Sequence, residues 1–101
     1  MERERRVTGA VQVLPLQADY LPVVDAAIAA IKQTGIRHEV TALETTLEGS
    51  FDEVLAAARA AHRACFEVGA DTVVTVIKIA ETRYGDATID ANVTKFREPN
   101  Q

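Results

Sequence analysis

The chain has 101 residues, of which 48% are apolar and 26% charged, so we expect one globular domain with a buried core. A net charge of −4 argues against nucleic acid as a partner, and a single cysteine excludes an internal disulfide or a multi-cysteine zinc site. The sequence shows neither an apolar leader nor an apolar run of membrane-spanning length, so we expect a cytoplasmic protein with no membrane partner.

The first third of the chain reads as a strand followed by a helix. Apolar and polar residues alternate over 7–16, which predicts a strand, and Pro15 ends it because proline cannot donate to a ladder. Apolar residues then recur at helical spacing over 20–34, with Asp19 as the expected cap. Gly35 stands where a glycine that ends a helix is expected.

The middle of the chain predicts a hairpin and a second helix. Residues 36–47 alternate over a length that suits two short strands, with a turn near Leu43 or Glu44. Ser50 and Glu53 have the spacing of a capping box, which marks the start of a helix. The buried stripe of that helix is expected to consist of Val54, Ala58, Ala61, Cys65 and Val68.

The last third predicts a strand and a short helix. Residues 72–79 are rich in valine and isoleucine, which predicts a strand that is central or at least well covered. Residues 88–93 are expected to form a short helix capped by Thr88. The charged segment 1–6 and the end 98–101 are expected to fray.

The order strand, helix, strand, strand, helix, strand predicts an α+β domain over 7–97 with the ferredoxin-like βαββαβ fold. In that fold, two helices cover one face of a four-stranded antiparallel sheet. The other face is expected to be bare, and it carries a set of apolar residues: Ala10, Leu14, Val74 and Val76. Monomers seldom expose such a patch, so we expect a second chain to cover it.

The common sequence motifs of enzymes and metal sites are absent from the chain. The sequence contains no Walker loop, GxGxxG, HExxH, CxxC or GxSxG. His38 and His62 lie on different predicted elements without a third ligand, so we expect no metal and place both at the surface or the edge of the core. Cys65 lies on the buried stripe of a helix and is expected to be a small core residue.

Two charged residues have both a structural and a functional interpretation. Lys78 stands within an apolar strand, so it either pairs with an acid or contacts a ligand or another chain. Glu48 ends a predicted strand before a helix, where it either lies near the positive helix end or meets a ligand.

Together, several segments resemble the small thiamine-binding protein family, over roughly 7–96. The most specific are the Thr-Thr-hydrophobic-Glu-Gly segment at 45–49 and the Ile-Lys-Ile strand at 77–79, which match in order and separation. The segments 11–16 and 34–35 agree as well. The chain departs from the usual family pattern at Leu43-Glu44, where the family has Met-Gly, and at Ala80, where it has aspartate.

The resemblance implies the ferredoxin-like fold and a non-catalytic cytoplasmic protein that forms homodimers or homotetramers. It also implies binding of thiamine or its hydroxymethylpyrimidine moiety, with no cofactor or metal. An aminopyrimidine has donors and acceptors that hydroxyl, amide and carboxylate groups can match. We therefore expect the ligand to contact a set of polar residues, namely Gln12, Thr45, Thr46, Glu48 and Lys78.

Two other functions remain open at this point. The chain could be a structural or regulatory module whose function is association through the sheet. It could also be a small enzyme that uses Glu48 and Lys78 as an acid–base pair, which requires both groups within hydrogen-bond reach of one ligand.

Overall fold

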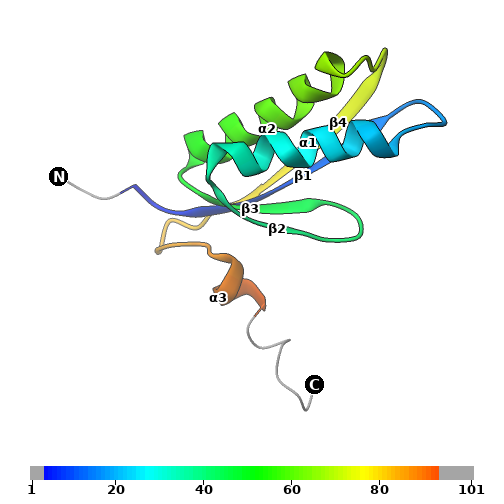
Figure 1. Ribbon diagram of the computed structural model, residues 1–101. Coiled ribbons are helices and arrows are strands. Elements are labelled where there is room, and N and C mark those ends of the chain that lie inside the picture. Colours follow the sequence, from blue (N-terminus) through cyan, green and yellow to red (C-terminus); the bar gives the residue numbers. More distant parts are fainter. Residues whose placement is uncertain (1–3, 94–101) are drawn as a thin grey trace.

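The computed structural model describes residues 4–93, and within them four strands form one antiparallel sheet in the order β2-β3-β1-β4 (Figure 1). This order and the two long helices confirm the predicted ferredoxin-like α+β fold. Of the segments expected to fray, residues 1–3 and 98–101 lie outside the described part. Residues 5 and 6, also expected to fray, make specific contacts: Arg5 pairs with Glu81 at 2.6 Å, and the Arg6 N–H donates to Asp86 at 2.9 Å. The elements are β1 (Val7–Pro15), α1 (Leu21–Thr34), β2 (Arg37–Val40), β3 (Thr45–Gly49), α2 (Phe51–Glu67), β4 (Val73–Ala80) and α3 (Ile89–Val93).

The register of the sheet decides which residues share a face. Val11 of β1 lies opposite Thr45 of β3 and Ile77 of β4. Because side chains alternate along a strand, residues next to these three point to the other side of the sheet. We call the side that α1 and α2 cover the helix face and the other side the open face. Thr8, Ala10, Gln12, Leu14, Thr46, Glu48 and Lys78 share the open face.

Both long helices form largely as predicted. The capping box of α2 is present, with the Ser50 N–H donating to Glu53 Oε1 at 2.8 Å and the Glu53 N–H donating to Ser50 Oγ at 3.1 Å. Helix α1 ends at Gly35, whose φ of 77° is the left-handed conformation that glycine adopts readily. The predicted cap at Asp19 is wrong, because the N-cap position is Tyr20 and no side chain caps the helix.

The core lies between the helices and the sheet and is built mainly from alanine and valine. The predicted stripe of α2 is confirmed at Val54, Ala58, Ala61 and Cys65, all of which are fully buried. Val68 is 55% exposed, contrary to the prediction, because α2 has already ended there. Gly9 allows α2 to approach β1 closely, since a Cβ at this position would collide with Val54. None of the helices within residues 4–93 is long and apolar enough to cross a membrane.

Strand β4 lies at the edge of the sheet, so the prediction that it is central or well covered is wrong. Its neighbours are β1 on one side and no other strand of the described chain on the other side. Val74, Val76 and Ile77 are 46%, 38% and 45% exposed. A run rich in β-branched residues predicts a strand but does not give its place in the sheet.

The open face is covered at one end, where a bare face was expected. Helix α3 lies on the side of the sheet away from α1 and α2 (Figure 1). The Thr8 hydroxyl donates to the Ala87 carbonyl at 2.8 Å, and the Ile89 N–H donates to Glu48 at 2.8 Å. Thr88 caps α3 as predicted, accepting from the Ala91 N–H at 3.0 Å. The chain that follows β4 therefore turns back and binds the sheet.

Candidate functional site

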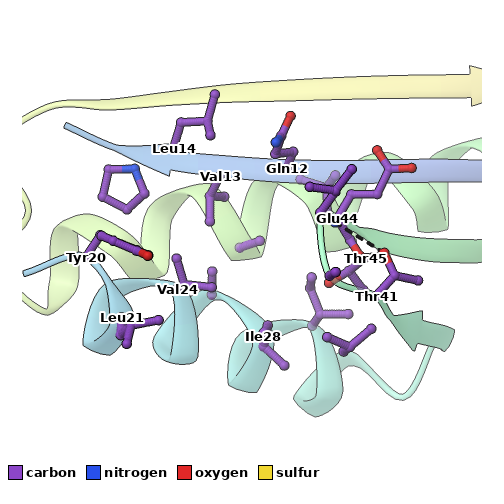
Figure 2. Close-up of a pocket in the computed structure, with 18 of the residues that line it drawn as sticks. Gln12, Val13, Leu14, Tyr20, Leu21, Val24, Ile28, Thr41, Glu44 and Thr45 are labelled. Carbon is purple, nitrogen blue, oxygen red and sulfur yellow. Dashed lines mark hydrogen bonds between the residues drawn. The ribbon is translucent and has the colours of Figure 1, made fainter. Parts of the chain in front are cut away.

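A cavity of about 620 Å³ lies on the helix face, between α1 and the sheet (Figure 2). Its walls are apolar side chains from both layers, including Val13 of β1 and Val24 and Ile28 of α1. The 41–44 turn between β2 and β3 and the segment before α1 complete the wall. The volume lies in the range of about 300–1,000 Å³ that is usual for small-molecule sites.

Few polar groups reach this cavity. Thr45 lines it and is only 5% exposed, and its hydroxyl makes no hydrogen bond to any other residue of the described part of the chain. The hydroxyl of Thr41, in the adjacent turn, already donates to the Glu44 carbonyl at 2.7 Å. Tyr20 is 50% exposed at the rim. Within the described residues, no fully buried side-chain oxygen or nitrogen lacks a hydrogen-bond partner, so the Thr45 hydroxyl keeps some accessible surface. Because Thr45 lines the cavity, its hydroxyl marks the polar end of the site.

The five predicted site residues are divided between the two faces of the sheet, with four on the open face and one, Thr45, on the helix face. Thr45 is on the helix face, whereas Thr46, Glu48 and Lys78 are on the open face. Gln12 lines the cavity, but Figure 2 shows its amide on the side of β1 away from α1. The alternation of β3 separates Thr45 from its neighbours, because successive side chains point to opposite sides of a sheet.

Glu48 is 5% exposed and belongs to a network of charges on the open face. Its carboxylate accepts from Arg6 Nε at 3.1 Å, from Arg37 Nη1 at 3.3 Å and from the Ile89 N–H at 2.8 Å. Arg37 Nη2 also pairs with Asp90 at 3.1 Å, and this hydrogen bond raises the pKa of the guanidinium. These partners occupy the carboxylate and hold α3 against the sheet.

Lys78 pairs with an acidic residue, which was one of the two roles expected for it from the sequence. Its Nζ lies 2.9 Å from Glu44 Oε1, and the lysine side chain is 65% exposed. In the register of the sheet, Lys78 is opposite Ala10, so the pair crosses the open face over β1. The partners of Lys78 and Glu48 thus differ, and no contact between these two residues supports the acid–base pair of the enzyme alternative.

The histidine and cysteine of α2 have structural contacts. His62 Nδ1 lies 2.6 Å from the Thr75 hydroxyl, and its ring meets the edge of Phe66. The Cys65 thiol donates to the Ala61 carbonyl at 3.4 Å, and burial raises its pKa, which disfavours the reactive thiolate. Within residues 4–93, no three side chains of His, Cys, Asp or Glu gather closely enough to hold a metal ion.

Sequence reasoning missed most of the cavity wall. Tyr20, Val24, Ile28 and Thr41 all line it, whereas Phe51, the aromatic residue nearest the Thr-Thr segment, does not. The usable signal was the apolar stripe of α1, which includes residues that the sheet does not fully bury. Periodicity identifies such residues as apolar, but it does not show that a space remains in front of them.

Comparison with known proteins identifies a family and several relatives over most of the chain. Residues 9–97 match the family of thiamine-binding proteins. A UPF0045 protein of Clostridium perfringens is 38% identical over 88 residues, which are 85% of this chain and 92% of that protein. A UPF0045 protein of Methanothermobacter thermautotrophicus is 32% identical over 96 residues, covering 91% of this chain and 97% of that protein.

Solved structures share the fold over nearly the whole chain. A domain of unknown function from Bacillus cereus superposes with a TM-score of 0.87 at 42% identity, covering 93% of this chain and 92% of that one. A Thermotoga maritima protein, named as a candidate thiamine biosynthesis/salvage protein, superposes with a TM-score of 0.81 at 32% identity. That match covers 91% of this chain and 99% of the other.

Proposed function

This chain belongs to the thiamine-binding protein family, and we propose that it binds thiamine or a related hydroxymethylpyrimidine, without turnover, in the cavity between α1 and the sheet. The observation that carries the proposal is the unpartnered Thr45 hydroxyl, 5% exposed, at an otherwise largely apolar wall. An unpartnered hydroxyl at the wall of a cavity of ligand size can pair with the polar edge of a heteroaromatic ligand.

The chemistry of an aminopyrimidine suits this arrangement. Its flat ring has two apolar faces, which can pack between Val13 of β1 and Ile28 of α1. Its edge carries an amino donor and ring-nitrogen acceptors, and the Thr45 hydroxyl can donate to a nitrogen or accept from the amino group. Tyr20, half exposed at the rim, is placed to cover the outer part of the ligand.

The absence of turnover is supported by the distribution of charged groups. Glu44 is the only charged residue among those that line the cavity, and Figure 2 shows its carboxylate on the far side of β1 from α1. Glu48 and Lys78, the acid and base of the enzyme alternative, are both on the open face. General acid–base catalysis needs a titrating group within hydrogen-bond reach of the ligand. Among the lining residues, only the Tyr20 phenol, half exposed at the rim, is left as such a group.

The experiment compares two neighbouring threonines that point to opposite faces. Calorimetric affinity for thiamine and for hydroxymethylpyrimidine should fall by about three- to tenfold in Thr45→Val, because one hydrogen bond is lost while the shape of the side chain is kept. Thr46→Val is the matched control and should bind as the wild type does. Equal losses in both variants would contradict this cavity as the site, and a wild type that binds neither compound at millimolar concentration would refute the function.

We also propose that copies of the chain associate through the uncovered part of the open face. Leu14, Val74 and Val76 are 38%, 46% and 38% exposed there, next to each other across β1 and β4. This patch supports the alternative in which association through the sheet is itself a function. The two functions are compatible, because the cavity and the patch are on opposite faces.

A further inference from the structure

We propose that the cavity selects its ligand by charge, accepting neutral or cationic heterocycles and rejecting their phosphate esters. This inference rests on the proposed function and specifies its ligand class. None of the residues that line the cavity is a lysine, arginine or histidine, and the one acidic residue among them, Glu44, has its carboxylate on the far side of β1 from α1. A phosphate group that enters such a site loses water without gaining a cation, which costs free energy.

Lys78, the lysine of the sheet, does not supply the missing cation. Lys78 is bound to Glu44 at 2.9 Å on the open face, so its charge is already paired and lies on the wrong side of β1. To reach a ligand on the helix face, the ammonium would have to leave this carboxylate and pass the β-sheet backbone. Lys78 therefore contributes no phosphate contact in the cavity.

The N-terminus of α1, which borders the cavity at Tyr20 and Leu21, is also poorly suited to an anion. Free N–H groups in the first turn are what make a helix N-terminus bind phosphate. Here Pro22 has no N–H, and the N–H groups of Val23 and Val24 both donate to the Tyr20 carbonyl, at 3.1 and 3.0 Å. The one feature of the wall that commonly holds phosphate has thus lost most of its donors.

Acidic residues around the cavity also disfavour an anionic ligand. Asp19 directly precedes Tyr20 in the chain and Asp25 directly follows Val24, and both aspartates are exposed. The whole chain carries a net charge of −4. Negative potential at the mouth disfavours the approach of a phosphate and favours a cation such as a thiazolium.

The test is a calorimetric series with thiamine, thiamine monophosphate and thiamine diphosphate at one ionic strength. We expect each phosphorylated compound to bind at least about tenfold more weakly than thiamine, because the phosphate finds no partner. Thiamine diphosphate that binds as tightly as thiamine, or more tightly, would overturn the selection by charge while leaving the proposed function intact. If none of the three compounds nor free hydroxymethylpyrimidine binds, the proposed function fails and this inference fails with it.

A substitution at the rim of the cavity tests whether phosphate esters are excluded by their charge or by their size. Leu43 lies in the turn that borders the cavity and is 77% exposed, so Leu43→Arg adds a cation without disturbing the core. Compared with Leu43→Gln, the arginine variant should narrow the ratio between the thiamine and thiamine diphosphate affinities by about three- to fivefold, the size of an exposed ion pair. An unchanged ratio would show that the phosphate is excluded by shape, which contradicts selection by charge.

Discussion

The two faces of the sheet differ sharply in how they use polar residues. The helix face contains a largely apolar cavity lined by the Thr45 hydroxyl, which makes no hydrogen bond within residues 4–93. The open face holds the ion pairs of Glu48 and Lys78 and an exposed apolar patch beside them. Residues that are adjacent in the sequence thus serve different purposes, because a strand sends successive side chains to opposite sides.

A second contrast lies within the open face, between two glutamates four residues apart. The Glu48 side chain is 6% exposed and accepts from two arginines and one backbone N–H. The Glu44 side chain is 27% exposed, and within residues 4–93 its carboxylate pairs with Lys78 alone, whose side chain is 65% exposed. Burial and the number of partners make the first carboxylate a structural element of the fold and the second a surface charge.

The largest expected effect is the loss of association through the open face. If copies associate through the open face as proposed, Val76→Glu should dissociate them, because an unpaired carboxylate would enter a dry contact between copies. Light scattering after size exclusion should then give a mass near 11.0 kDa for the variant and a multiple of it for the wild type. Val68→Glu is the control, since Val68 is also exposed but follows α2 and is not part of the sheet. A wild type of 11.0 kDa would contradict the association.

The next largest effect is a loss of stability on the helix face, where α2 packs closely against β1. Gly9→Ala would place a methyl group into Val54, so either α2 or the valine must move. We expect a loss of about 2–3 kcal/mol in the free energy of unfolding, measured in urea, which is typical of overpacking. Ala10→Gly, one residue away and on the open face, is the control and should cost about 0.5–1 kcal/mol through backbone entropy. Similar losses in both variants would argue against a close α2–β1 contact.

A smaller effect sharpens the contrast between the glutamates. Glu48→Gln should lower the free energy of unfolding by about 2 kcal/mol, because it removes the charge shared by Arg6 and Arg37, while Glu44→Gln should cost about 0.5 kcal/mol or less. Neither change should alter thiamine affinity more than about twofold, since Glu48 is on the open face and the Glu44 carboxylate points away from the cavity. A tenfold loss of affinity in Glu48→Gln would restore the ligand role expected from the sequence.

Much of the fold follows from local signals that act over a few residues. The capping box at Ser50 and Glu53 and the glycine at Gly35 mark helix ends because each satisfies backbone groups within one turn. The alternation of apolar and polar residues also predicted the two faces of β1 correctly, because successive side chains of a strand point to opposite sides. The helix cap at Asp19 was wrong because the turn before α1 places Tyr20, and not the aspartate, at the N-cap position.

The site could not be predicted in the same way, since it depends on contacts between distant segments. Glu48 is buried because the chain after β4 returns to cover it, over a separation of 41 residues from Ile89. The cavity exists because α1 and the 41–44 turn leave space between them, and no pattern within either segment encodes that distance. The ligand roles expected for Thr46, Glu48 and Lys78 stay predictions, and the geometry favours Thr45.

The most direct test of the proposed site is methyl NMR of the labelled protein during titration with hydroxymethylpyrimidine. We predict that the methyl signals of Val13, Val24 and Ile28, which line the cavity, shift in a saturable way while those of Val74 and Val76 on the open face stay in place. Shifts confined to Val74 and Val76, with the cavity methyls unmoved, would place the ligand on the open face and contradict binding between α1 and the sheet.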